Sequence, residues 1–224
     1  MHPEYPKRFM PSPFAPAAPQ IMWKPMYKQY RFLSCPAFEV GYGGAPGGGK
    51  SDGMAVAPLQ DIQIPNYHAL ILRRKYSDLE QSLVMKTMEL YRGRAEWDGQ
   101  RKRWRFPNGS SIAFGHCKNE NDIYNYQSAQ FEFIGFEQVE QFTERMYLYF
   151  FTRCRTVKPN VKPKIRSNFN PGGIGHQWLK KRFWIHDQSK PPDQMYDVTV
   201  TLTHPDGKLE SFTYLRAYIP ATVY

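Results

Sequence analysis

The sequence has little of what marks several common protein classes. It holds three cysteines, which lie far apart and form neither a Cys-x-x-Cys pair nor a Cys/His metal spacing: Cys35, Cys117 and Cys154. This odd, scattered set argues against a disulfide framework and predicts three reduced thiols. No window approaches the ~18 consecutive apolar residues typical of a membrane span. Prolines interrupt the N-terminus, so we expect no secretion signal and a cytosolic protein.

Acidic residues are outnumbered by basic ones. Asp and Glu total 20 and Lys and Arg total 30, which gives a formal net charge of +10. The excess fits a polyanionic partner, although charge alone does not identify nucleic acid.

The 224 residues suffice for one large domain with a sizeable core. Residues 1–22 are rich in proline and predict an irregular N-terminal arm before a globular domain at residues 23–224.

Short apolar runs alternate with segments of helical periodicity along most of the chain. Strands are predicted at residues 39–43, 68–73, 131–136 and 164–169. Helices are predicted at residues 52–59, 77–91, 143–155 and 176–184. Ser77 and Glu80 fit a capping box at the start of the second helix. Turn signals predict two β-hairpins, formed by residues 102–106 with 111–115 and 196–202 with 209–215. The pattern predicts an α/β fold with a mostly parallel central sheet flanked by helices, with added β-hairpins.

The segment GAPGGGKS at residues 44–51 fits the P-loop pattern G-x-x-x-x-G-K-[ST]. Its glycines let the backbone bring N–H groups against phosphate oxygens, and the following helix directs its positive end at the same anion. Lys50 is expected to reach the β- and γ-phosphates, and the Ser51 hydroxyl to bind Mg²⁺. The predicted ATP-binding residues of this segment are Gly44, Gly47, Gly48, Gly49, Lys50, Ser51 and Asp52.

Hydrolysis needs a second acidic group that holds Mg²⁺ through water. Glu137 follows directly on the apolar strand at residues 131–136. Ligands gather at the carboxyl ends of parallel strands, so this carboxylate is expected beside the P-loop. Hydrophobic residues before an acid are common, and the alternative is an ordinary buried strand with a solvated glutamate.

Several segments together resemble one family, the large terminase subunits of tailed double-stranded DNA bacteriophages. They are KPMYKQYRFL, YGGAPGGGKSD, HALILRRKYSDLEQSL, RWRFPNGSSIAFGH, YQSAQFEFIGFEQVEQFTE, YLYFFTRCR and NFNPGGIGHQWLKKRF. The resemblance covers nearly all of residues 23–224. It implies a RecA-like ATPase domain that uses ATP and Mg²⁺ to drive double-stranded viral DNA through a portal into a procapsid. It also implies a ring of copies on the capsid, a small terminase subunit as partner, and the host cytoplasm as location, without a membrane.

The resemblance assigns roles to individual residues. Gln29 lies where the family has a glutamine that contacts adenine. Lys50 and Ser51 match the P-loop lysine and the magnesium-binding hydroxyl. Glu137 matches the Walker B acid, which binds the metal through water. Asn170, within NPGG, lies in the motif that couples the γ-phosphate to motion.

The chain departs from the family pattern after the Walker B acid, where it has Gln138 instead of the usual catalytic glutamate. A neutral amide cannot accept a proton from water. Either Gln138 is a mutation that traps ATP and impairs hydrolysis, or the catalytic acid is elsewhere, with Glu140 the nearest candidate. We favour the first alternative here, which predicts that Gln138→Glu raises turnover at least about tenfold.

A second departure is at Gln127, near which relatives carry an arginine that reaches into a neighbouring site. The cations that could substitute are Arg153, Arg155, Arg101, Arg103 and Arg105, each of which could equally be a surface or DNA-facing charge. A basic stretch around Trp104 also predicts weak, salt-sensitive DNA binding by Arg101, Lys102, Arg103 and Arg105, with a solvated hairpin face as the alternative.

The family continues into a nuclease domain, which we do not expect in residues 1–224, so no DNA cleavage is predicted for this chain. Two other functions remain open from the sequence. One is a helicase-like ATPase that remodels nucleic acid. The other is a catalytically impaired nucleotide-binding module, suggested by Gln138.

Overall fold

The computed structural model describes residues 23–203 and 209–221. Its centre is a nine-stranded sheet with the order β3-β4-β5-β2-β6-β7-β1-β9-β8. The six strands from β5 to β9 in this order pair in parallel, and antiparallel pairs extend the sheet at both edges. The strands are β1 Glu39–Gly44, β2 His68–Arg73, β3 Glu96–Asp98, β4 Arg103–Arg105, β5 Ser111–His116, β6 Phe133–Phe136, β7 Lys164–Phe169, β8 Met195–Thr203 and β9 Leu209–Ala221.

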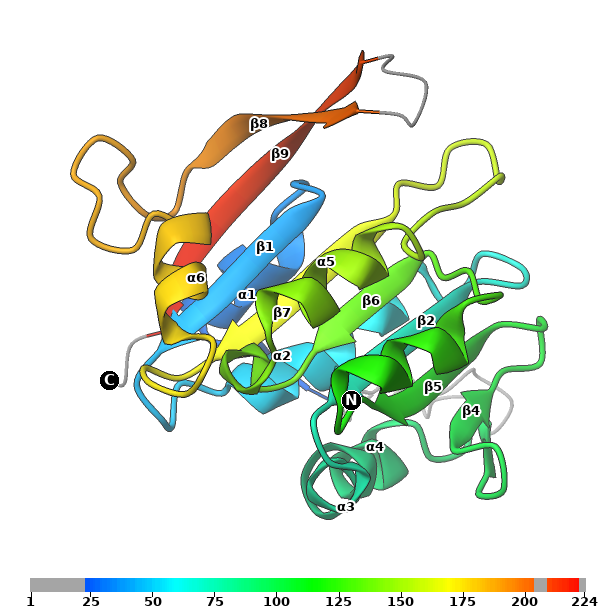
Figure 1. Cartoon of the computed structure of the whole chain (residues 1–224). Coiled ribbons are helices and arrows are strands. Elements are labelled where there is room, and N and C mark those ends of the chain that lie inside the picture. The colour runs from blue at the N-terminus through cyan, green and yellow to red at the C-terminus, as the bar shows by residue number, and fades with distance from the viewer. Residues whose placement is uncertain (1–22, 204–208, 222–224) are drawn as a thin grey trace, which may run out of the picture.

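Helices cover both faces of this sheet, with α5 and α6 in front of it and α1 and α2 behind it in Figure 1. The α-helices are α1 Tyr27–Ser34, α2 Lys50–Val56, α3 Tyr76–Leu79, α4 Met85–Leu90, α5 Glu144–Phe151 and α6 His176–Arg182. A π-helical segment, Glu80–Val84, joins α3 to α4. Three 3₁₀ segments are Ala57–Asp61, Glu120–Tyr126 and Val139–Gln141. Among the described helices, none has the length and apolar character needed to cross a bilayer.

The core has two parts, one on each face of the sheet, because side chains of a strand alternate between faces. Ala69 and Ile71 of β2 belong to the cluster that contains Phe32 of α1. Leu70 and Leu72 of the same strand belong to the cluster that contains α5. Burial on both faces explains why residues 69–72 of β2 form a continuous apolar run in the sequence.

The expected fold class, a mostly parallel α/β sheet with helices on both faces and added hairpins, is confirmed. Strands β2 and β7 have the predicted bounds, and β1 is one residue longer. The hairpin of β4 and β5 is present, and β3 pairs beside it as an additional edge strand. The hairpin of β8 and β9 is also present, and its predicted turn at residues 204–207 lies outside the described residues. The predicted arm at residues 1–22 lies outside them as well.

Several predicted boundaries were wrong. The helix predicted at residues 52–59 begins at Lys50 and continues as a 3₁₀ turn, because Gly49 provides its left-handed N-cap. The helix predicted at residues 77–91 begins at Tyr76, so Ser77 lies inside it and the predicted capping box does not form. Strand β6 begins at residue 133, two residues late, and the helices predicted to end at residues 155 and 184 end at residues 151 and 182.

Strand β9 is longer than predicted, and its second half joins the parallel sheet beside β1. Residues 216–221 pair with Glu39–Gly44, while the first half of β9 forms the β8–β9 ribbon that projects from the sheet in Figure 1. One strand therefore connects the ribbon to the strand that leads into the P-loop.

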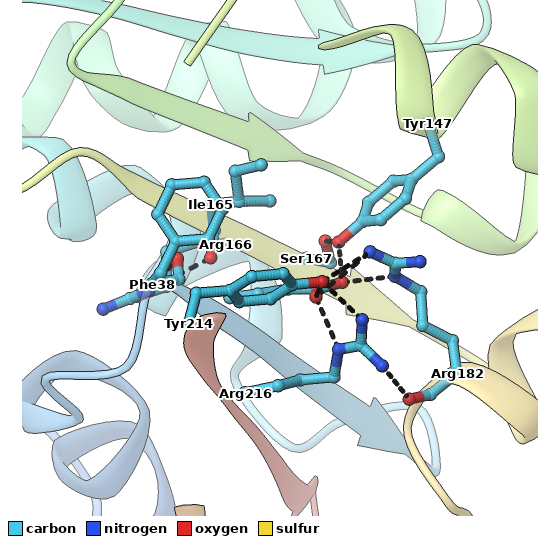
Figure 2. A network of polar contacts seen from close by, with 9 residues as sticks. Phe38, Tyr147, Ile165, Arg166, Ser167, Arg182, Tyr214 and Arg216 are labelled. Atoms are coloured by element: carbon cyan, nitrogen blue, oxygen red, sulfur yellow. Dashed lines mark hydrogen bonds and ion pairs between the residues drawn. The ribbon is translucent and has the colours of Figure 1, made fainter. Parts of the chain in front are cut away.

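A buried ion network lies at the start of β1, and Figure 2 shows it from close by. The carboxylate of Glu39 is fully buried and accepts hydrogen bonds from Tyr147 and Arg182 on one oxygen, and from Arg182, Tyr214 and Arg216 on the other. These donors come from α5, α6 and β9. The network therefore fixes three elements to the first residue of β1, at the opposite end of that strand from the P-loop.

Candidate nucleotide-binding site

The P-loop connects the carboxyl end of β1 to the first residue of α2. Gly47 has φ +86° and Gly49 has φ +63°, a backbone conformation that glycine adopts without strain. The Tyr42 hydroxyl donates to the Gly48 carbonyl at 2.8 Å, which fixes the loop against β1. A Cβ on Gly49 would lie 2.2 Å from Nε2 of Gln29, so this position also requires glycine for space.

Lys50 and Ser51 occupy the first turn of α2. The Lys50 ammonium curls back to donate to the carbonyl oxygens of Gly44 at 3.1 Å and Ala45 at 2.5 Å. Burial lowers the pKa of Lys50, and the nearby carboxylates of Glu140 and Glu137 oppose that shift. The ammonium is thus held inside the loop by weak neutral acceptors, which an incoming phosphate can replace with charged ones.

Glu137 follows β6 directly and meets the P-loop, as predicted. The Ser51 hydroxyl donates to its Oε1 at 2.6 Å across 86 residues of sequence. Asn168 of β7 donates from Nδ2 to the other carboxylate oxygen of Glu137 and accepts the backbone N–H of Gln138 at 2.8 Å. Sequence reasoning missed Asn168, which lies in a buried strand that also contains other polar residues.

These groups line a pocket of about 340 Å³ between the P-loop and the ends of β6 and β7, which we call the P-loop pocket. Its lining residues are Pro46, Gly47, Gly49, Lys50, Ser51, Asp52, Lys86, Glu137, Gln138, Asn168 and Asn170. Of these, Lys86 of α4 forms an ion pair with Asp52 and was also missed by the sequence reasoning. The pocket brings together cations and backbone donors on one side and acidic and amide groups on the other.

The oxygen groups at one end of this pocket fit a magnesium ion. Ser51 and Glu137 offer a hydroxyl and a carboxylate to the same point, and they hydrogen-bond each other in this structure. Mg²⁺ commonly takes one or two protein ligands and completes its shell with water and substrate phosphates. Within the described part of the chain, no group of three or more His, Cys, Asp or Glu side chains could form a metal site made by protein alone.

Gln138 adopts a left-handed backbone, with φ +56°. Its side-chain oxygen accepts from a guanidinium nitrogen of Arg73 at 2.6 Å and from Nε2 of Gln141 at 2.8 Å. Arg73 is the last residue of β2 and was not among the predicted site residues. The side chain of Gln138 is therefore positioned at the wall of the pocket by two donors.

Glu140 lies one turn further, in the 3₁₀ segment, and is 6 % exposed. Asn170 donates from Nδ2 to one of its carboxylate oxygens at 3.4 Å. The backbone N–H of Gly175 donates to its carbonyl at 2.8 Å. Burial raises the pKa of Glu140, and the hydrogen bonds from the backbone and Asn170 oppose that shift. The two predicted residues Glu140 and Asn170 are therefore in contact, and Asn170 lines the P-loop pocket.

Gln29 lies on α1 and is 2 % exposed. Its amide nitrogen donates to the Gly49 carbonyl at 2.7 Å, and its amide oxygen accepts the Met26 N–H at 2.8 Å. Both ends of the amide are therefore bound to backbone, and the side chain holds the P-loop against α1. Its contact with adenine stays a prediction.

The four predicted DNA-binding cations lie together at the far edge of the sheet. Arg103 and Arg105 approach the carboxylate of Asp98 at 3.8 and 4.0 Å. The Lys102 ammonium lies 3.6 Å above the ring of Tyr76, and Arg101 is exposed. The hairpin thus presents basic side chains outward, while Trp104 between them is buried.

Two of the candidate arginines for catalysis lie far from the site within one chain. The backbones of Arg153 and Arg155 hydrogen-bond to Phe131, just before β6, whereas Glu137 lies just after that strand. These residues therefore lie at the opposite end of β6 from the P-loop pocket. Their role toward a neighbouring copy stays a prediction.

Comparison with known proteins identifies the family. Residues 36–206 match the model of the phage terminase large subunit. Among solved structures, the large terminase of a thermophilic bacteriophage has a TM-score of 0.58 at 18% identity, over 70% of this chain and 42% of that one. The ATPase domain of the Thermus phage P74-26 large terminase has a TM-score of 0.57 at 14% identity, over 88% of this chain and 81% of that one.

A second structure of the first of these large terminases, in complex with ADP, has a TM-score of 0.57 at 16% identity, over 73% of this chain and 42% of that one. A comparison with curated proteins gave no match. The aligned part therefore spans 42% of that full large terminase, and the structural likeness shows the fold of a terminase ATPase domain. The match over residues 36–206 covers most of the sequence, and the chain belongs to the phage terminase large subunit family.

Proposed function

We propose that this chain binds ATP with Mg²⁺ and hydrolyses it, as the motor domain that drives double-stranded viral DNA into a procapsid. The observation that carries the proposal is the hydrogen bond of 2.6 Å between Ser51 and Glu137, beside the buried Lys50. This bond joins the P-loop to the acidic residue after β6, two parts of a P-loop ATPase site that lie far apart in the sequence. Solved relatives in complex with ADP and with ATP-gamma-S support nucleotide as the ligand.

In this proposal each polar residue of the pocket has a task toward the triphosphate. The loop N–H groups bind the α- and β-phosphates, and Lys50 leaves the carbonyls of Gly44 and Ala45 to bind the β- and γ-phosphates. Ser51 and Glu137 hold Mg²⁺, Glu137 through water, and the ion would neutralise charge on the phosphate oxygens. Asn168 keeps Glu137 oriented through its Nδ2 donation. Asn170 couples the state of the γ-phosphate to movement of the loop that follows it.

Membership of the family supports the finer parts of the proposal. The motor would act as a ring of copies at the portal of a procapsid, together with a small terminase subunit, in the host cytoplasm. The basic residues of the β4–β5 hairpin would contact DNA phosphates without reading sequence. Gln138 in place of a carboxylate would slow hydrolysis unless another acid supplies the base.

The test measures ATP binding and phosphate release by the purified chain. Calorimetric titration with ATP-gamma-S and Mg²⁺ should show binding, and Lys50→Ala should abolish it, with Lys180→Ala on the exposed face of α6 as control. Phosphate release should increase with double-stranded DNA. Absence of nucleotide binding would refute the proposal.

Two other results would assign a different function. Binding without phosphate release, with or without DNA, would indicate the impaired nucleotide-binding module. Stimulation by single-stranded DNA alone would indicate the helicase-like remodelling ATPase. The family match supports neither alternative.

A further inference from the structure

The side chain of Gln138 has no free acceptor. A carbonyl oxygen has two lone pairs, and both are used, by Arg73 at 2.6 Å and by Gln141 at 2.8 Å. The group that remains on this side chain is its NH₂, which can only donate. Gln138 can therefore bind a phosphate oxygen, but it can neither accept a hydrogen bond from the attacking water nor take its proton.

Two acceptors behind the same pocket lack a donor. Within the part of the chain that the structure describes, Glu140 Oε2 and Asn170 Oδ1 are buried and have no hydrogen-bond partner. Asn170 lines the P-loop pocket and joins Glu140 through the 3.4 Å contact. Buried acceptors without donors are rare because they lose the hydrogen bonds that water would give them. A water molecule has two hydrogens, and one placed here could satisfy both acceptors.

The burial of Glu140 favours its use as a base. Lys50 of α2 and Glu137 after β6 are the charged groups that act on it, with opposite signs. Both also belong to the proposed triphosphate site. Burial raises the pKa of Glu140 above that of an ordinary glutamate. A base works best when its pKa lies nearer the working pH, because it then accepts a proton readily while still ionised.

We propose that Glu140 is the general base of the ATPase reaction and that Asn170 holds the attacking water with it. The inference rests on the proposed function. The water oxygen forms a bond to the γ-phosphorus, and the bond from that phosphorus to the bridging oxygen breaks, with its electron pair leaving on ADP. The water proton passes to Glu140, which later releases it to solvent. Gln138 donates to the γ-phosphate and takes no proton.

The first experiment compares steady-state ATP hydrolysis by wild type and variants. Glu140→Gln preserves size and the contact to Asn170 but cannot accept a proton, so kcat should fall at least about 100-fold. Binding of ATP-gamma-S and the thermal midpoint should stay near the wild-type values. Glu140→Asp should recover part of the rate. Glu144→Gln is the matched control, because Glu144 is exposed on α5 and should keep the full rate.

A second variant separates this proposal from impairment by Gln138. Gln138→Glu places a carboxylate against Arg73, where it is neutralised, and should not increase kcat. An increase of about tenfold or more would place the base at residue 138 and overturn the proposal. A Glu140→Gln rate within about threefold of wild type would also overturn it. A loss of rate that comes with lost nucleotide binding, or that Glu140→Asp does not relieve, would assign Glu140 a structural role instead.

A crystal structure of the wild-type chain with ADP, Mg²⁺ and aluminium fluoride tests the roles of Glu140 and Asn170 without a measurement of turnover. The expected result is a water within hydrogen-bond distance of both Glu140 Oε2 and Asn170 Oδ1, facing the fluoride. A water held elsewhere would overturn the proposal. If wild type binds ATP-gamma-S but releases no phosphate, the proposed ATPase function fails. The position of this water still tests whether Glu140 holds the attacking water.

Discussion

Removing the charge of Glu39 should destabilise the whole domain. Its carboxylate is fully buried and accepts five hydrogen bonds, three of them from Arg182 and Arg216 (Figure 2). The side chains of these arginines are only 10% and 8% exposed. Glu39→Gln keeps the volume but turns an NH₂ group toward the cations. Two buried positive charges then lose their counter-charge.

Breaking a buried ion pair by removing one partner costs about 3 to 5 kcal/mol. We expect a loss of this size in the free energy of unfolding of the Glu39→Gln variant. A domain of this length loses roughly 2 to 4 °C per kcal/mol, so the thermal midpoint should fall by about 10 °C. The loss arises mainly from Arg182 and Arg216, which stay buried without a counter-charge. A further Arg216→Met substitution should therefore restore part of the stability.

Urea denaturation followed by circular dichroism measures this effect, with the midpoint and the slope fitted separately. The control is Arg145→Ala, which removes an ion pair with Glu120 between exposed side chains and should leave the urea midpoint unchanged. A shift for Glu39→Gln no larger than that of the control would refute the reasoning. Nucleotide binding at low temperature should survive, because Glu39 lies at the other end of β1 from the P-loop.

Three further predictions concern the site and its charges. Gly49→Ala should weaken binding of ATP-gamma-S and lower stability by about 1 to 3 kcal/mol, because φ is +63° and the new Cβ would displace Gln29. The control is Gly93→Ala, which has φ +72° and open space around it, and which should lower stability without loss of nucleotide binding. Chelation of Mg²⁺ should stop phosphate release, and Ser51→Ala should raise the Mg²⁺ concentration needed for half-maximal rate, whereas equal Mg²⁺ curves would contradict a metal role for this hydroxyl. Arg105→Ala should lower the slope of log affinity for DNA against log salt concentration by about one, and an unchanged slope would place the DNA elsewhere.

The sequence was sufficient for features that depend on local pattern. Strand β2 is an apolar run bounded by turn and polar residues, β7 ends at the Pro-Gly-Gly break after Asn170, and the ends of both strands were predicted to the residue. The P-loop needs glycines at fixed spacing, and Gly44, Gly47 and Gly49 adopt positive φ values, whereas Gly48 does not. Glu137 could be placed because it ends an apolar strand in a sheet with a parallel order.

Features that depend on contacts between distant segments were not predictable. Asn168 of β7 and Lys86 of α4 line the P-loop pocket, and Arg73 of β2 binds Gln138 at its wall. Nothing in their local sequence distinguishes them from other polar residues at strand ends or on helices. Ser77 shows the converse error, since its pattern fits a cap but the helix begins one residue before it. Local pattern identifies candidates for a cap, and packing of the neighbouring segment decides which one is used.

The segment from Asn168 to Arg182 connects the nucleotide site to the opposite end of β1. Asn168 binds both Glu137 and the backbone of Gln138, and Asn170 contacts Glu140. The chain then turns through glycines with positive φ into α6, whose last residue, Arg182, binds Glu39. Since α6 is fixed to Glu39 by a buried ion pair, we expect any movement of Asn170 to be taken up at Gly172 and Gly173, whose positive φ glycine adopts without strain, and not by α6.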